Sequence, residues 1–246
     1  NYQSLTAALD AAQPTDTVSI VDDSEFAFDS KQTVNTDGLI IEAGDGANPT
    51  LDLTGGGTLA LKAPVTVRGL SIVGDYAGNG LDESGVGVSV QGGGSGSTIV
   101  DNEITGFYGG IQTLSNTSNV TISENTVSDT AFAIATQGCN DRIEANTVSS
   151  DIQSIATYKA DGVTIVDNTL EVDSTGLTDA QTFGGNGPAR GLDLQGANLT
   201  VSGNDVTAVA DRDVVFFIAG DATNTEAELT ANNEYSGSPV FVDASN

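Results

Sequence analysis

The stretch VTISENTV, residues 120–127, returns as VTIVDNTL at residues 163–170. Three related stretches, STIVDNEI, DRIEANTV and LTVSGNDV, also carry an asparagine in the sixth place. These asparagines are separated by 23, 21, 22 and 36 residues, the last gap being one period plus an insertion; they are Asn102, Asn125, Asn146, Asn168 and Asn204. Such a period is typical of a solenoid, in which each repeat buries its apolar side against its neighbours.

The segments between the asparagine stretches are strands rather than helices, because they alternate with period two and are bounded by Gly, Asn or Ser. Leucine-rich repeats share the asparagine pattern but would need a helical return segment. The sequence therefore predicts an all-β fold, a parallel β-helix of about ten coils stacked about 4.8 Å apart. The return segments are GVSVQGG (87–93), GIQTLSN (110–116), AIATQGC (133–139), SIATYKA (154–160) and GLDLQGA (191–197).

Stacked coils would place the five asparagines above one another as a structural ladder. Each side-chain amide could then bind its neighbours and the turn backbone, and Asn tolerates the left-handed turn conformation. In VTVRGLSI (65–72) Leu70 takes the asparagine place. We interpret AELTANNE (227–234) as a frayed last copy, with Asn232 or Asn233 in register.

The start of the chain predicts a short capping helix within residues 1–15. Ser4 can cap SLTAALDAA, whose Leu5 and Leu9 share one apolar face with two alanines. This helix would cover the open core of the first coil, so we expect a single domain, 1–246, capped at one end. Two irregular stretches, 74–85 and 177–191, predict loops that protrude from the rod, where functional residues often gather.

The charge balance limits the partners. The chain has 34 acidic and seven basic residues, a formal net charge of −27, which disfavours nucleic acid and anionic membranes. It contains no apolar run of about 18 residues, so we expect no membrane insertion.

Cys139 is the single cysteine and cannot form an internal disulfide. Because the sequence starts at Asn1 and lacks methionine, we expect a leader or parent segment to have been removed. The acid-rich, lysine-poor composition resembles that of secreted halophilic archaeal proteins.

The order of these segments also resembles a known superfamily. SLTAALDAA followed by DTVSIV, LIIEAG, APVTVRGLSIVG and recurrent VTIxxNxV is similar to the pectin-lyase-like, right-handed parallel β-helices. Within them, the periplasmic copper-maturation and carbohydrate-binding branch is the most similar. The resemblance covers essentially the whole chain and implies a right-handed helix. It implies less about function, since this scaffold carries lyases, hydrolases, adhesins, phage tail spikes and sugar-binding modules.

No catalytic group is predicted from the motifs. A polygalacturonase-like enzyme would show a Gly-His-Gly motif, and the chain has no histidine. A calcium-dependent lyase would gather several carboxylates on one face, and no such cluster stands out. We therefore expect no cofactor and no metal; calcium is the one alternative, and no ligand cluster supports it. The pair Asp141 and Asp161 is a weak catalytic candidate, because adjacent coils bring carboxylates together by chance in so acidic a chain.

The candidate ligand-binding residues lie on one sheet face and in the two loops. Aligning the return strands gives one outward column of Ser89, Gln112, Ala135, Ala156, Asp193 and Phe216, and a second of Gln91, Leu114, Gln137, Tyr158, Gln195 and Ile218. Amide and phenol groups on a flat face suit sugar hydroxyls, and an ordinary solvated face is the alternative. The residues singled out for binding are Gln137, Tyr158, Lys159, Arg190, Gln195, Tyr76 and Phe183.

Three N-glycosylation sequons begin at Asn116, Asn119 and Asn198, all at predicted turns. With the composition, they favour an extracellular protein of a cell surface or virion. We expect a non-catalytic, rigid surface or fibre module that recognises a glycan or glycoprotein. The alternatives are a polysaccharide lyase or glycoside hydrolase, and a structural subunit that self-assembles through the ends or faces of the β-helix.

Overall fold

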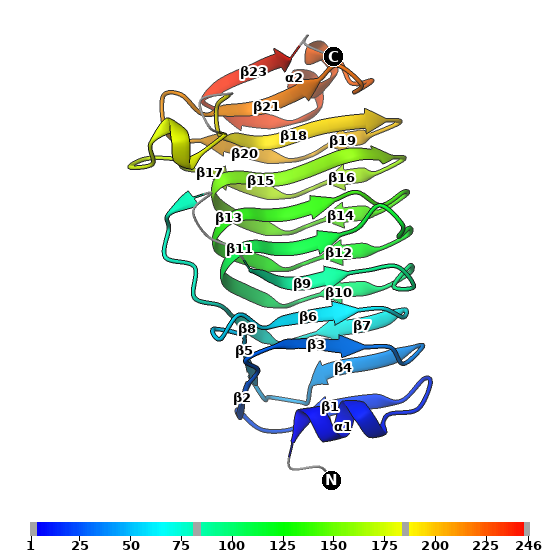
Figure 1. The fold of residues 1–246 in the computed structure, drawn as a ribbon. Coiled ribbons are helices and arrows are strands. Elements are labelled where there is room, and N and C mark those ends of the chain that lie inside the picture. Colours follow the sequence, from blue (N-terminus) through cyan, green and yellow to red (C-terminus); the bar gives the residue numbers. More distant parts are fainter. Residues whose placement is uncertain (1–3, 81–84, 184–186, 244–246) are drawn as a thin grey trace.

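The computed structural model describes residues 4–80, 85–183 and 187–243. The chain winds into a right-handed parallel β-helix, and its coils stack as a rod with the two termini at opposite ends (Figure 1). Residues 81–84 and 184–186 of the two predicted loops lie outside the described residues.

The first face is an eight-stranded parallel sheet built from the stretches that precede the asparagines. Its strands are short because each one ends at the asparagine corner. In stacking order they are β1 (Thr17–Ile20), β4 (Leu39–Ala43), β7 (Val65–Arg68), β10 (Thr98–Val100), β12 (Thr121–Ser123), β14 (Arg142–Glu144), β16 (Thr164–Val166) and β19 (Thr200–Ser202).

The second face begins directly after the asparagine corner and is also parallel. In three central coils its strands are long and continue through the next corner. In stacking order it contains β2 (Glu25–Ala27), β5 (Thr50–Asp52), β8 (Ser71–Val73), β11 (Glu103–Thr113), β13 (Thr126–Thr136), β15 (Thr147–Asp161), β17 (Thr169–Val172), β20 (Asp205–Ala208) and β22 (Glu234–Ser236).

The third face is formed by the predicted return segments. The carboxyl-terminal halves of β11, β13 and β15 lie at its centre, because these strands span both faces. Its further strands are β3 (Lys31–Val34), β6 (Thr58–Leu61) and β9 (Val86–Val90) on one side, and β18 (Arg190–Ala197), β21 (Val214–Ala219) and β23 (Ser238–Asp243) on the other. The 3-10 turn η2 (Asp179–Gln181) lies in the loop before β18.

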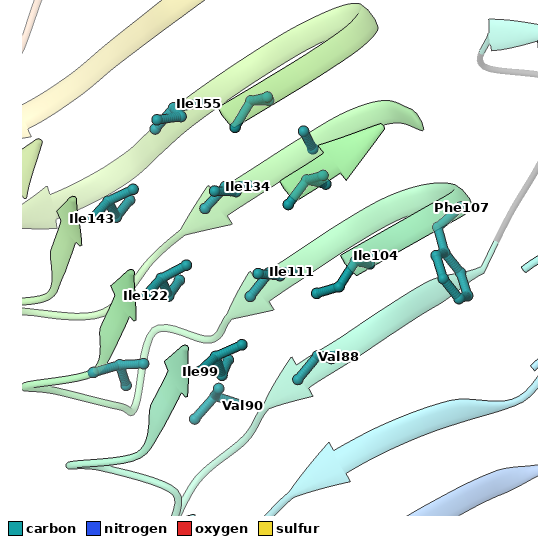
Figure 2. Packing of buried hydrophobic residues seen from close by; sticks show 14 of the residues in the cluster. Val88, Val90, Ile99, Ile104, Phe107, Ile111, Ile122, Ile134, Ile143 and Ile155 are labelled. Carbon is teal, nitrogen blue, oxygen red and sulfur yellow. The ribbon is translucent and has the colours of Figure 1, made fainter. Parts of the chain in front are cut away.

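The interior is filled by stacked aliphatic side chains, because the inward position of each strand repeats in every coil. Ile99, Ile122 and Ile143 align on the first face, opposite a column of valine and isoleucine on the third face (Figure 2). All three are fully buried. These columns explain why no single repeat is stable alone: each coil exposes its core unless another covers it.

Helices occupy both ends of the rod. At the first end α1 (Leu5–Ala11) buries Leu5 and Ala8, and the Ser4 hydroxyl accepts a hydrogen bond from the Ala7 N–H. At the other end α2 (Glu226–Asn232) lies beside β19 and takes the place of a further first-face strand. The expectation of a strand in residues 227–234 was therefore wrong, whereas the expected asparagine in register is present as Asn233. The expectation of a helix at one end only was also wrong.

The sixth-place asparagines form a continuous hydrogen-bonded ladder inside the corner. The Nδ2 of each asparagine donates to the Oδ1 of the next one over 2.8–3.0 Å, from Asn102 through Asn204 to Asn233. Each backbone N–H donates to the same oxygen. At the first end the ladder stops at Leu70, whose N–H donates to Asn102 Oδ1.

The left-handed conformation at this corner belongs to the residue before each asparagine and not to the asparagine itself. Asp101, Glu124, Ala145 and Asp167 have φ values of 54° to 57°, and Gly203 has 71°. Our expectation that the asparagines themselves adopt this conformation was wrong. The asparagines are buried because their amides turn inward, while the preceding residue turns the chain and faces solvent.

Replacing Asn146 with alanine should lower the free energy of unfolding by about 2–4 kcal/mol, because it leaves buried donors of Asn125 without their acceptor. Denaturant unfolding measures the change. The matched control is Asn119→Gly, at an exposed asparagine with φ of 56°, where we expect a change below about 0.5 kcal/mol. Equal losses in the two variants would contradict a stabilising ladder.

Candidate functional site

The outward side of the third face carries side chains that are largely buried, although they point away from the core. Such burial is unusual on an outer face and marks the place where the loop before β18 packs back on the sheet. Two adjoining columns define it, as the strand register shows: Phe132, Gln153, Arg190 and Val214 in the first, and Ala135, Ala156, Asp193 and Phe217 in the second.

A polar network is centred on Asp193, which is completely buried. Its carboxylate accepts from Arg190 Nη1, with which it forms an ion pair, and from Gln153 Nε2. Gln195 Nε2 donates to the other carboxylate oxygen over 3.1 Å. Tyr158 completes the network by donating its hydroxyl to Gln153 Oε1. We call these five residues the Asp193 cluster.

Arg190 lies between two aromatic rings. Its guanidinium carbon is 3.9 Å from the ring centroid of Phe183, which comes from the loop, and 3.4 Å from that of Phe217, which comes from β21. This stacking favours arginine because its guanidinium is planar and weakly hydrated. Among the described residues its Nε finds no hydrogen-bond partner, so Arg190 is held by stacking and by Asp193.

An aromatic cluster adjoins Arg190. The ring centroids of Tyr108 and Phe132 are 5.1 Å apart, and those of Phe132 and Phe183 are 6.1 Å apart with nearly perpendicular planes. All three rings are half-buried. Phe132 stands on β13 and Tyr108 on β11, so the rigid sheet fixes two of the rings and the loop supplies the third.

The two irregular loops contact each other on the same side of the rod (Figure 1). Gln181 Nε2 donates to the carbonyl oxygen of Asn79 over 3.4 Å. The first loop is tied to the sheet, because the Tyr76 hydroxyl donates to Asp151 Oδ2 over 2.7 Å and accepts from the Gly80 N–H. The loops thus form a connected rim beside the aromatic cluster.

Burial is the main cause of the pKa shifts in the site. It raises the pKa of Tyr158 well above the ordinary value of 10, and the nearby Asp193 carboxylate raises it further. Burial alone raises the pKa of Tyr108. It also raises the pKa of Asp193, although Arg190 and the two glutamines oppose this shift. Both tyrosines therefore remain protonated at neutral pH, and Tyr158 acts as a hydrogen-bond donor to Gln153.

Comparison with known families gives one match. The family model described as "Periplasmic copper-binding protein (NosD)" matches residues 67–225, well over half of the chain. The chain belongs to the NosD family. A comparison with curated protein sequences finds no match.

Two solved structures share the fold of this NosD-family chain. The Dettilon tailspike protein (gp208) is 14% identical with a TM-score of 0.56, and the match covers 94% of this chain and 40% of the tailspike chain. The alginate lyase from Paenibacillus sp. str. FPU-7 is 16% identical with a TM-score of 0.54, and the match covers 98% of this chain and 96% of the lyase. At this identity the likeness shows the parallel β-helix fold and not an activity.

The structure brings several of the predicted binding residues together. Tyr158, Gln195 and Arg190 meet through the Asp193 cluster, and Phe183 covers Arg190. Arg190, expected to be available to a ligand, is only 7% exposed and paired. Three further predicted residues lie apart from the cluster itself: Gln137 is half-buried directly after β13, Lys159 is exposed beside Tyr158, and Tyr76 binds Asp151.

The two carboxylates considered for catalysis hold the corner between the third and first faces. Asp141 is 1% exposed and accepts from the Val120 N–H and from the Thr113 and Thr136 hydroxyls. Asp161 is exposed and accepts from Asn198 Nδ2. The two were a weak candidate for a carboxylate pair, and the structure leaves Asp161 exposed while Asp141 points inward. The sequon residues Asn116, Asn119 and Asn198 are all exposed.

Sequence reasoning missed Tyr108, Phe132 and Phe217. The first two could have been found, because aligning GFYGG with the next coil places Gly109 opposite Phe132. The expected outward positions Phe216 and Ile218 were wrong: Asp193 aligns with Phe217, and Phe216 points into the core. The sequence alignment of this strand was off by one residue, because no repeated motif marks it.

Among the described residues no group of three or more His, Cys, Asp or Glu side chains could hold a metal ion. None of the described helices is long and apolar enough to cross a membrane.

Replacing Arg190 with methionine should lower the free energy of unfolding by about 3–5 kcal/mol, because it leaves the buried Asp193 carboxylate without its ion-pair partner. Urea unfolding measures the loss. In the double variant Arg190→Met, Asp193→Leu most of the stability should return, since neither charge is then buried. A double variant no more stable than Arg190→Met would contradict the explanation that the unpaired Asp193 carboxylate causes the loss of stability.

Proposed function

We propose that this protein is a non-catalytic extracellular module, of a cell surface or a virion, that recognises a glycan on its third face. The observation that carries the proposal is the aromatic cluster, held by a rigid sheet beside polar side chains and rimmed by two connected loops. Half-buried rings stack on the apolar face of a sugar, and amides and phenols bind its hydroxyls.

The geometry supports binding in preference to catalysis. A lyase or hydrolase, the alternative function, needs a base or a pair of carboxylates open to the substrate. Tyr158 is held protonated, Asp193 is covered and bound by three donors, and Asp141 points inward. The two structural neighbours, a tailspike and an alginate lyase, are compatible with either function, so the assay must include cleavage.

The family description names copper binding, but the residue types of this chain do not suit a copper site. Copper sites in proteins are built from histidine, cysteine and methionine side chains. The chain has no histidine, no methionine and one cysteine, Cys139. We therefore derive no role for copper.

Self-assembly through the rod ends is the third alternative. Open strand edges at an end can pair with another chain. On the first face α2 lies beside β19, so this edge is covered, and α1 lies at the other end of the rod (Figure 1). Among the described residues β22 and β23 each pair with one strand only, so the second and third faces keep an open edge at the end that carries α2, and self-assembly remains the alternative.

The binding test uses a panel of acidic and neutral polysaccharides, with retention of the protein and new reducing ends or unsaturated uronate absorbance measured together. We expect retention without cleavage. Tyr108→Leu and Phe132→Leu should each weaken binding about fivefold, because a stacked ring contributes on the order of 1 kcal/mol. The control is Tyr235→Leu, at an exposed ring on β22 of the second face.

Cleavage of any polymer would contradict the proposal and favour the enzyme. Binding that survives both cluster variants but is lost in Tyr235→Leu would place the site elsewhere.

We also propose that the acidic surface suits concentrated salt. Asp101 and Glu124 are exposed and occupy equivalent positions in adjacent coils, about 4.8 Å apart, so their charges repel. Glu124→Gln should therefore raise the free energy of unfolding by a few tenths of a kcal/mol in dilute buffer. In about 1 M salt, where the screening length is about 3 Å, the gain should vanish. A gain that is independent of salt would contradict this explanation.

A further inference from the structure

The seven cations of the chain fall into two classes. Each of the four arginines forms an ion pair with a carboxylate. Among the described residues, none of the three lysines does: Lys31 donates to Gln91 Oε1, and Lys62 and Lys159 are exposed without a carboxylate partner. In a chain with 34 acidic residues, unpaired lysines are unexpected.

All three lysines lie on the third face. Lys31 opens β3, Lys62 directly follows β6, and Lys159 lies in β15. The backbone ladder places Lys62 in one outward column, which continues through Gln91, Leu114, Gln137, Tyr158 and Gln195. Lys62 and Tyr158 are four coils apart, which corresponds to about 19 Å at about 4.8 Å per coil.

Lys159 reaches the surface through a local irregularity. Thr157 and Ala160 are buried, and the register with β18 shifts between them. Lys159 has a φ of 57°, a left-handed backbone conformation that residues other than Gly and Asn rarely adopt. In a regular strand the residue after outward Tyr158 would point inward. The bulge instead holds Tyr158 and Lys159 on the outside together.

The same strip is depleted of acidic residues. Its two outward columns contain Ala60, Ser89, Gln112, Ala135, Ala156 and Asp193, and Lys62, Gln91, Leu114, Gln137, Tyr158 and Gln195. The single carboxylate among them, Asp193, is buried and paired with Arg190. The exposed charged side chains of the strip, Lys62 and Lys159, are therefore both basic, although exposed Asp161 lies at its edge and the net charge of the protein is −27.

We propose that this strip, from Lys62 to Lys159, binds an acidic glycan chain that lies along the rod, with its anionic groups on the two lysines and its hydroxyls on the amides between them. The inference rests on the proposed glycan recognition and specifies the class of glycan. Lys62 and Lys159 attract carboxylate or sulfate groups at the two ends of the strip. Because they are several coils apart, a disaccharide cannot contact both, and a longer oligomer can.

The test measures binding of the purified protein to a size-fractionated oligouronate, to the same oligomer with its carboxyl groups reduced to alcohols, and to a sulfated neutral oligomer. We expect the charged oligomers to bind more tightly than the reduced one, and their affinity to fall as salt rises. The preferred charged oligomer identifies carboxylate or sulfate as the recognised group.

The variants Lys62→Gln and Lys159→Gln should each weaken binding of the charged oligomer a few-fold, and the double variant about five- to tenfold, as expected for exposed charge contacts. None should change binding of the reduced oligomer. The matched control is Arg68→Gln on the first face, whose side chain is 53% exposed and pairs with Glu42.

Lys159→Gly separates binding from folding, because glycine adopts a positive φ without strain. This variant should be at least as stable as the wild type and yet bind the charged oligomer as weakly as Lys159→Gln.

Equal affinity for charged and reduced oligomers, with dependence on Tyr108 and Phe132, would overturn the charge assignment and leave glycan recognition standing. An equal loss in Arg68→Gln would also overturn it, because the effect would then be one of net charge. Binding to none of the oligomers would overturn both proposals.

Discussion

The hydrogen bonds from each sixth-place asparagine to the next coil are the interaction on which the rest of the structure depends. The backbone N–H and the side-chain amide of one asparagine converge on a single Oδ1 in the next coil, so adjacent coils have one register. A slip by one residue would turn the buried isoleucine columns outward. Fixing this corner therefore also aligns the third face, where the candidate site lies.

The sequence was sufficient for the fold because the ladder and the period-two strands repeat in every coil. It was insufficient where a coil departs from the repeat. Residues 227–234 keep an asparagine in register but form α2, and the signal for this was the capping box of Thr225 and Glu228, a local pattern rather than a repeated one. The left-handed residue at the corner was also misplaced by one position, because it varies between Asp, Glu, Ala and Gly.

The site was predictable in part. Outward alternation was enough to put Tyr158, Gln195 and Arg190 on one face, and the structure connects them. Burial was not predictable, because it depends on the loop before β18, which brings Phe183 over Arg190 and has no periodicity. For the same reason Asp141 seemed available on the pattern of charges alone, whereas its partners Thr113 and Thr136 come from two different coils.

Two departures from what stability favours coincide on the third face. Lysine in a left-handed bulge destabilises a strand in which glycine would be relaxed, and unpaired lysines stand where the rest of the surface is acidic. Either feature alone would have a local explanation. On one face of the rod, beside half-buried rings on a rigid sheet, the proposed binding function would account for both departures. An anionic ligand fits this function, because it needs a cation held outward on a surface that otherwise repels it.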